Sequence, residues 1–270
     1  MALWVIVGAG YTGGALARRL AAEGHELVAT RRTPAAGHDV ETTGAPAHAG
    51  FPGTIVLDLA QPPERAFPGA IVVCCAPPGA EPALEMQHLI AVGGRRIVYV
   101  SSTGVYAPGG GGWVDESWPL APTTRSGQAR LAAERALPSD AVTLRAAGIH
   151  GPGRGLVERL RAGTYRIVGD GRAHVSRIHV DDLVETIVRA GLSTATGAFN
   201  VADDDPAPIG EVADAVAAQL GLPPPPRVAA STVDPEVAGM LTADRRIANG
   251  RIKAELGVVL RYPSWRAVLA

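Results

Sequence analysis

The hydrophobic residues of this chain fall into short apolar runs that alternate with segments of helical spacing. Residues 3–7 (LWVIV) form the first run, and apolar positions then recur at helical spacing from Thr12 to Glu23. Short apolar runs are typical of buried strands, whereas recurrence at every third or fourth position is typical of amphipathic helices. Continued along the chain, the pattern predicts strands at residues 26–30, 54–57, 70–75, 96–100, 142–145 and 198–201, and helices at residues 81–92, 128–134, 183–190 and 209–220.

Strands that alternate with helices are typical of an α/β fold with a parallel sheet. We therefore expect a Rossmann-type, doubly wound parallel sheet in one domain, residues 1–270. After Arg154 the elements become shorter, with a helix expected at 156–161 and a strand at 165–168. Residues 155–270 are expected to contribute a small C-terminal lobe that covers the substrate. Residues 33–53 are rich in Pro, Gly, Ala and Thr and predict a loop or a weak helix.

Composition narrows the classes of partner. A hydrophobic content of 47% is enough for a full core, and a net charge of −1 gives no reason to expect nucleic acid or an anionic membrane surface. The first apolar run is too short to span a bilayer and does not follow a basic leader, so we expect a cytoplasmic protein. Cys74 and Cys75 are adjacent in an apolar run, which indicates neither a disulfide framework nor a metal site.

The first predicted strand ends in a glycine-rich turn. Gly8, Gly10 and Gly13 are spaced as GxGxxG and are followed at once by a predicted helix. This order allows a tight turn, a close backbone approach to a pyrophosphate, and close packing of helix on strand. We therefore expect Gly8, Gly10, Tyr11, Thr12 and Gly13 to bind a dinucleotide; an ordinary strand–helix turn is the alternative.

Two arginines follow the second predicted strand. An acidic residue at this place binds the ribose 2′-hydroxyl of NAD, whereas arginine accommodates the 2′-phosphate of NADP. The chain has Arg31 and Arg32 there and no carboxylate before Asp39. Because a guanidinium group suits a phosphate in charge and geometry, we expect NADP(H) as the cofactor. The alternative is a solvated loop.

The ends of the next two strands supply further candidates, because the carboxyl ends of parallel strands face the ligand crevice. Asp58 is a candidate for the adenine amino group, with Leu59 beside it, although Asp58 could equally cap a helix. Cys75, Ala76 and Pro77 are expected on the adenosine side.

Residues 101–106 (SSTGVY) follow the fifth predicted strand and resemble the SSxxVYG segment of extended and atypical short-chain dehydrogenases/reductases. The similarity implies the Rossmann fold over nearly the whole chain, a small-molecule substrate, and possible homodimers. The similarity continues through residues 115–116, Pro122, and residues 128–134, 144–154 and 177–183. Residues 246–262 also resemble the end of atypical members that are often labelled NAD-dependent epimerase/dehydratase.

The resemblance also implies a catalytic pattern that this chain lacks. In the family a tyrosine acts as acid and base, a lysine four residues later lowers its pKa, and an upstream hydroxyl binds the substrate oxygen. Ser102 matches the hydroxyl, but alignment places Ser126 at the tyrosine position and Arg130 at the lysine position. Lys253 is the only lysine and Asn249 precedes it by four residues, so no YxxxK is present. Arg130 is expected to bind the nicotinamide ribose.

Three hypotheses remain. The first is an NADP(H)-dependent oxidoreductase acting on a small carbonyl or imine, whose proton comes from Tyr106, His150 or Tyr165. The second is a nucleotide-sugar epimerase or dehydratase, against which Val175 stands at the family's diphosphate-binding arginine. The third is a catalytically silent NADP-binding sensor or scaffold.

We favour the first hypothesis, with Ser102, Tyr106 and His150 as catalytic candidates. The substrate pocket is expected to be bordered by these three residues and Arg177, and Trp113 is expected to close over it on a hinge of Gly109–Gly112. His179 lies in an apolar strand and is expected to make a buried hydrogen bond.

Overall fold

The computed structural model describes residues 2–32 and 54–266. The loop or weak helix predicted for residues 33–53, including Asp39, lies outside them. The described residues form a seven-stranded parallel sheet in the order β12-β7-β5-β4-β1-β2-β3. Its strands are β1 (Leu3–Val7), β2 (Glu26–Arg31), β3 (Thr54–Val56), β4 (Ile71–Cys74), β5 (Arg96–Ser102), β7 (Val142–Ala146) and β12 (Gly197–Val201).

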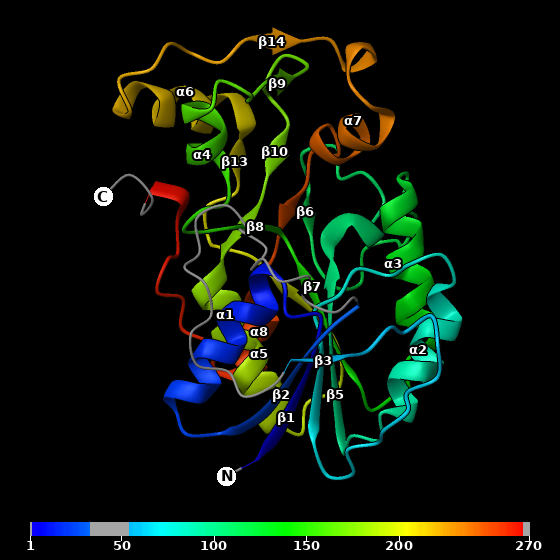
Figure 1. The fold of residues 1–270 in the computed structure, drawn as a ribbon. Coiled ribbons are helices and arrows are strands. Elements are labelled where there is room, and N and C mark those ends of the chain that lie inside the picture. The colour runs from blue at the N-terminus through cyan, green and yellow to red at the C-terminus, as the bar shows by residue number, and fades with distance from the viewer. Residues whose placement is uncertain (1, 33–53, 267–270) are drawn as a thin grey trace.

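Helices cover both faces of this sheet (Figure 1). One face carries α1 (Tyr11–Ala22), α5 (Val180–Leu192) and α8 (Gly250–Leu256), and the other carries α2 (Pro82–Ala91) and α3 (Arg125–Ala136). Strand β1 shows why both faces are apolar. Trp4 and Ile6 pack in the cluster with α1 and α5, whereas Val5 and Val7 pack in the cluster with α2. The expected Rossmann-type doubly wound fold is thereby confirmed.

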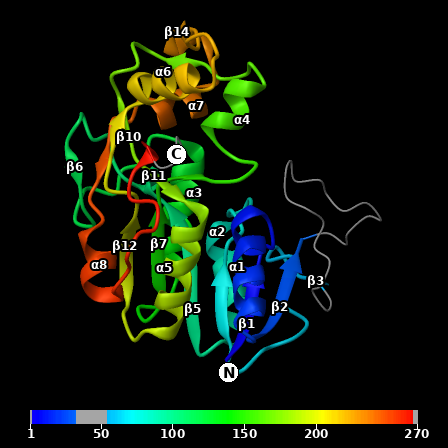
Figure 2. The ribbon, with the colours of Figure 1, turned by 90° about the vertical axis from the view of Figure 1, so that its left-hand side faces the viewer.

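A smaller lobe lies beyond the carboxyl ends of the strands (Figures 1 and 2). It has its own apolar cluster, in which Tyr165 and Ile167 pack with Val212, a residue of the lobe's longest helix. Its elements are α4 (Leu156–Arg161), β9 (Ile167–Val168), α6 (Ile209–Gln219), β14 (Arg227–Val228) and α7 (Pro235–Leu241). Residues 155–270 are thus divided, because α5, β12 and α8 return to the main sheet.

Short strand pairs connect the lobe to the sheet. The pairs are β8 (Gly148–His150) with β11 (Arg177–His179), β10 (His174–Val175) with β13 (Ala207–Pro208), and β6 (Trp113–Val114) with β15 (Arg246–Ile247). Two single-turn helices, Thr103–Val105 and Ala230–Thr232, complete the fold. Across the described residues, no helix is long and apolar enough to cross a membrane.

Candidate functional site

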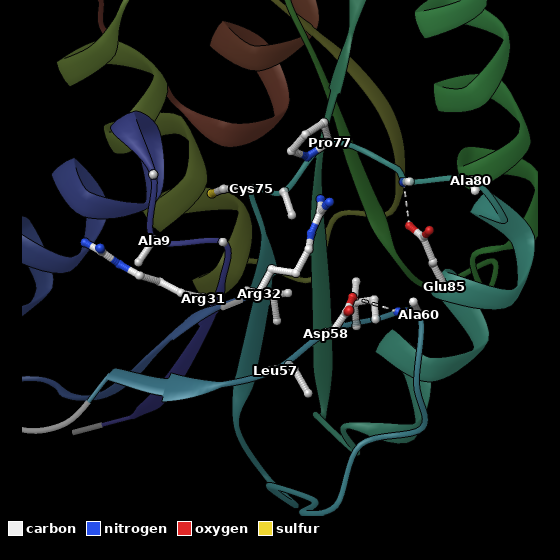
Figure 3. A pocket seen from close by; sticks show the side chains of 16 residues that line it. Ala9, Arg31, Arg32, Leu57, Asp58, Ala60, Cys75, Pro77, Ala80 and Glu85 are labelled. Carbon is white, nitrogen blue, oxygen red and sulfur yellow. Dashed lines mark hydrogen bonds between the residues drawn. The ribbon is translucent and has the colours of Figure 1, made fainter. Parts of the chain in front are cut away.

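A cavity of about 430 Å³ opens at the carboxyl ends of β1, β2 and β4 (Figure 3). It lies where the strand order reverses direction between β1 and β4, which is where doubly wound sheets bind their ligands. Nine of the predicted cofactor residues line it, namely Gly8, Gly10, Arg31, Arg32, Asp58, Leu59, Cys75, Ala76 and Pro77. Tyr11, Thr12, Gly13 and Arg130 were also predicted and do not line this cavity.

The three glycines have different structural roles. Gly8 adopts a φ of +89°, and a Cβ there would lie 2.7 Å from the backbone nitrogen of Ala76. A Cβ on Gly13 would lie 2.3 Å from the carbonyl oxygen of Gly8, so glycine allows α1 to pack on the turn. In contrast, a Cβ on Gly10 would meet nothing within 4 Å. The space in front of Gly10 is open, as the approach of a pyrophosphate requires.

The two arginines enter the site from the end of β2. Figure 3 shows Arg32 directed towards Pro77, between Cys75 and Asp58, and Arg31 extended in another direction past Ala9. Neither arginine forms a salt bridge within the described residues, and the Nε atom of Arg31 is buried without a hydrogen-bond partner. Within the part of the chain that the structure describes, these guanidinium groups are therefore not occupied by a carboxylate, as the binding of an anionic ligand would require.

Two carboxylates hold the loops on the opposite side of the cavity. Asp58 accepts a hydrogen bond from the backbone nitrogen of Ala60 at 3.1 Å, so it caps a turn while it lines the cavity. Asp58 therefore acts as a cap, as the alternative prediction had it, but it caps a turn and not a helix. Glu85 on α2 accepts from the backbone nitrogen of Gly79 at 2.7 Å. Glu85 was not among the predicted residues, although an acidic residue in the first turn of a helix is a typical signal.

Tyr11 connects the glycine turn to the segment that follows β8. Its hydroxyl donates to the carbonyl oxygen of Pro152 at 3.1 Å, and the guanidinium of Arg154 lies 5.2 Å from its ring centroid. Burial raises the pKa of Tyr11. Tyr11 therefore joins two sides of the crevice rather than lining the cavity itself.

The residues aligned with the family's catalytic group lie where β5 meets the start of α3. Ser102 ends β5 and accepts a hydrogen bond from the backbone nitrogen of Gly104 at 3.0 Å. Arg130, one turn into α3, donates to the carbonyl oxygen of Val100 at 2.8 Å. Ser126 donates its hydroxyl proton to Glu236 of α7, which also accepts from the backbone nitrogen of Ser126 at 2.8 Å. Nothing in the sequence pattern indicated Glu236.

The structure corrects the prediction that Tyr106 faces the crevice. Tyr106 is fully buried, and its hydroxyl donates to Oδ1 of Asn200 at 2.7 Å and accepts from Arg145 at 2.9 Å. Arg145 in turn forms a buried ion pair with Glu134 at 2.8 Å. Burial raises the pKa of Tyr106 to about 12. The single helical turn of Thr103–Val105 directs this side chain into the core, where it has a structural role.

The other aromatic candidates differ in position. Tyr165 packs in the lobe cluster instead of facing the crevice. His150 is half-buried on β8, and burial lowers its pKa to about 4, so its imidazole is neutral at physiological pH. His179 is buried and accepts from the backbone nitrogen of Asp181 at 3.2 Å, which confirms the predicted buried hydrogen bond.

The expected glycine hinge is also wrong. Gly109 and Gly111 donate backbone hydrogen bonds to Ala243 and Asp244, both at 2.8 Å. A Cβ on Gly109 would lie 2.5 Å from the carbonyl oxygen of Asp244. These glycines therefore allow a close backbone approach. Trp113 remains 56% exposed.

Comparison with known proteins supports the same architecture. No family model matches the chain. A 3-diazoavenalumate denitrifying reductase from a Streptomyces species is 35% identical over 198 residues, which are 65% of this chain and 64% of that protein. A conserved protein of unknown function from Silicibacter pomeroyi DSS is 29% identical, with a TM-score of 0.78 over 100% of this chain and 97% of that chain.

Two further solved structures that resemble this chain contain a nicotinamide cofactor. The human epimerase family protein SDR39U1, solved with NADPH, has a TM-score of 0.75 and 21% identity, covering 100% of this chain and 98% of that one. The dTDP-glucose 4,6-dehydratase DesIV of Streptomyces venezuelae, solved with NAD, has a TM-score of 0.78 and 20% identity, covering 100% and 95%. The Rossmann-type fold that the resemblance to the short-chain dehydrogenases/reductases implied is confirmed. At these identities the two structures show the fold alone.

Proposed function

We propose that the chain is an NADP(H)-dependent oxidoreductase that transfers hydride to or from a small organic substrate. The observation that carries this proposal is the cavity at the topological switch point, with open space before Gly10 and two arginines at the end of β2 that form no salt bridge among the described residues. In this arrangement the glycine turn and the start of α1 would hold the pyrophosphate, and Asp58 would face the adenine.

The preference for NADP(H) rests on Arg31 and Arg32. A charge-assisted hydrogen bond contributes about 1.5–3 kcal/mol, which corresponds to roughly 10- to 150-fold in affinity. The buried, unpartnered Nε of Arg31 and the inward direction of Arg32 support the binding of a 2′-phosphate. Arg130 would bind the nicotinamide ribose at the other end of the crevice.

Bound NADPH supplies a hydride at this end of the crevice. For a carbonyl or imine substrate, Ser102 would donate a hydrogen bond to the substrate heteroatom. Tyr106 does not supply the proton, because its hydroxyl is buried between Asn200 and Arg145. Since the imidazole of His150 is neutral, it holds no spare proton at physiological pH. Solvent is then the proton source for carbonyl or imine reduction.

The Streptomyces relative favours a second substrate class. Its name describes a reductase that removes nitrogen from a diazo compound. When hydride replaces dinitrogen on an arenediazonium carbon, the carbon–nitrogen bond breaks, a carbon–hydrogen bond forms, and both nitrogen atoms leave as N₂. This step requires no proton donor, so it suits a site without a tyrosine–lysine pair.

Titration calorimetry tests the cofactor. We expect NADPH and NADP to bind and NADH to bind weakly, and we expect Arg31→Ala and Arg32→Ala to lower the affinity for NADPH selectively. Arg172→Ala is the matched control, because this arginine is 91% exposed and lies in the lobe. Equal losses for NADPH and NADH would show that the arginines do not bind the 2′-phosphate.

Oxidation of NADPH is then followed with a panel of carbonyl compounds, imines and an arenediazonium salt. Turnover of any class supports an oxidoreductase and identifies its substrate type. Binding of NADPH without turnover of any class would overturn the proposal and leave the silent NADP-binding sensor or scaffold. Turnover of a nucleotide-sugar in place of these substrates would favour the epimerase or dehydratase hypothesis.

A further inference from the structure

The paired strands β8 and β11 form a polar face between the main sheet and the lobe. Arg177 lies opposite Gly148, and His179 lies opposite His150, in a parallel register. The imidazoles of the two histidines are in contact, with ring centroids 5.3 Å apart, so these positions share one face. The intervening Ile178 points into the core. Gly148, opposite Arg177, is exposed and has no side chain.

Arg177 is held on this face with one of its donors unused. Its Nη1 atom donates to the carbonyl oxygen of Val175 at 3.0 Å. Its Nη2 atom is buried and has no acceptor among the described residues. Burial lowers the pKa of Arg177, and the charges of Asp203 and Asp205 oppose that shift. A buried guanidinium donor without an acceptor is costly, so it calls for a partner.

Asp203 is a buried acid whose charge acts on Arg177. It follows β12, is 1% exposed, and its backbone nitrogen donates to the carbonyl oxygen of Arg177 at 2.6 Å. Neither of its carboxyl oxygens has a hydrogen-bond partner of normal geometry among the described residues. Burial raises the pKa of Asp203 to about 7, although the charge of Arg177 and the nearby backbone amides of Asp205 and Arg177 oppose the shift.

We propose that Arg177 and Asp203, whose side-chain Nη2 and carboxyl oxygens are buried without partners among the described residues, bind the carboxylate of a small organic acid. This deepens the proposed function, because the carboxylate would belong to the substrate of the same crevice. Arg177 supplies the opposite charge, and the protonated Asp203 supplies a second donor. An ionised Asp203 would instead repel the ligand.

The surrounding groups favour an anion. The charged or titratable groups that face the pair are His150, Tyr165 and Asp205. His150 is neutral above a pH of about 4, and burial raises the pKa of Tyr165, so both stay uncharged near neutral pH. The carboxylate of Asp205 is already bound by Ser264 and Arg266. Arg177 is thus the group of this set that retains an unused charged donor.

Calorimetric titration with sodium benzoate, in the presence and in the absence of NADPH, tests the proposal. We expect a dissociation constant on the order of 1 mM at pH 6. The affinity should fall about tenfold per pH unit above pH 7, because binding then takes up one proton. Benzamide, which has no charge, should bind much more weakly than benzoate.

Three variants locate the site. Arg177→Met should abolish benzoate binding, whereas the exposed Arg172→Met should leave it unchanged. Asp203→Asn should retain binding, because its amide still donates, and should lose the dependence on pH. Thermal unfolding checks each variant. If Arg177→Met does not fold, the pH profile of Asp203→Asn decides the question.

The outcomes separate the two proposals. Absence of benzoate binding in a protein that binds NADPH would show that water or the protein itself satisfies this pair, and would overturn only the carboxylate site. Equal affinity for benzamide, or an unchanged pH profile in Asp203→Asn, would do the same. Benzoate binding without any affinity for NADPH would support the site and overturn the proposed function.

Discussion

Replacement of Tyr106 by phenylalanine distinguishes a structural tyrosine from a catalytic one. The hydroxyl makes two buried hydrogen bonds, to Asn200 at 2.7 Å and from Arg145 at 2.9 Å. Without it, Oδ1 of Asn200 loses its donor and Nη1 of Arg145 loses its acceptor, whereas Nε and Nη2 of Arg145 keep their bonds to Glu134. Leaving a buried polar atom unsatisfied costs about 1–3 kcal/mol, and two atoms are affected here. We expect the free energy of unfolding to fall by at least that amount.

Urea denaturation measures the effect as a lower midpoint at an unchanged slope. The affinity for NADPH and the turnover of any substrate should remain within about twofold of wild type, since this hydroxyl contacts only the core. Tyr262→Phe is the control, because the Tyr262 hydroxyl makes no hydrogen bond among the described residues and its ring stacks on His179. A loss of turnover by two orders of magnitude at full stability would refute the structural role of Tyr106.

Three other perturbations follow from the same geometry. Gly10→Ala should fold normally and lose NADPH affinity, whereas Gly13→Ala should also lower the melting temperature, because only the second Cβ meets backbone atoms; equal melting temperatures would contradict this assignment. Glu134→Ala should destabilise the protein by about 3–5 kcal/mol in urea denaturation, because it leaves Arg145 buried without its counter-ion; a loss below about 1 kcal/mol would contradict a buried pair. The raised pKa of Asp203 means that the folded protein holds a proton that the unfolded chain releases between about pH 4 and pH 7. The free energy of unfolding should therefore fall by up to about 4 kcal/mol as the pH rises through that range, and Asp203→Asn should remove the effect. An Asp203→Asn profile parallel to wild type would assign the change to another group.

The fold and the residues that line the candidate cavity could be predicted because both follow from local patterns. An apolar run or a helical spacing involves neighbouring residues, and the carboxyl ends of parallel strands meet at one edge of the sheet. Arg31, Asp58 and Cys75 are far apart in sequence, yet strand topology alone brings them to one cavity.

The surroundings of the catalytic candidates could not be predicted in the same way. Whether Tyr106 faces the crevice or the core depends on one turn of helix after β5 and on partners as distant as Asn200. Glu236 reaches Ser126 from a helix that lies 110 residues later. The glycine run at 109–112 shows the same limit, because composition indicates small residues but not the backbone of Asp244 that they accommodate.

The hydrogen bond from Tyr11 to Pro152 has a consequence for the affinities of two ligands that bind on either side of it. Tyr11 begins the helix at the nucleotide turn, and residues 151–154 follow the strand that carries His150. A ligand that displaces residues 151–154 must break this bond and the contact of Arg154 with the ring, and so it changes the free energy of the nucleotide turn. By thermodynamic reciprocity, the nucleotide then changes the affinity for that ligand by the same factor. For such a ligand, the two halves of the crevice would act as one cooperative unit.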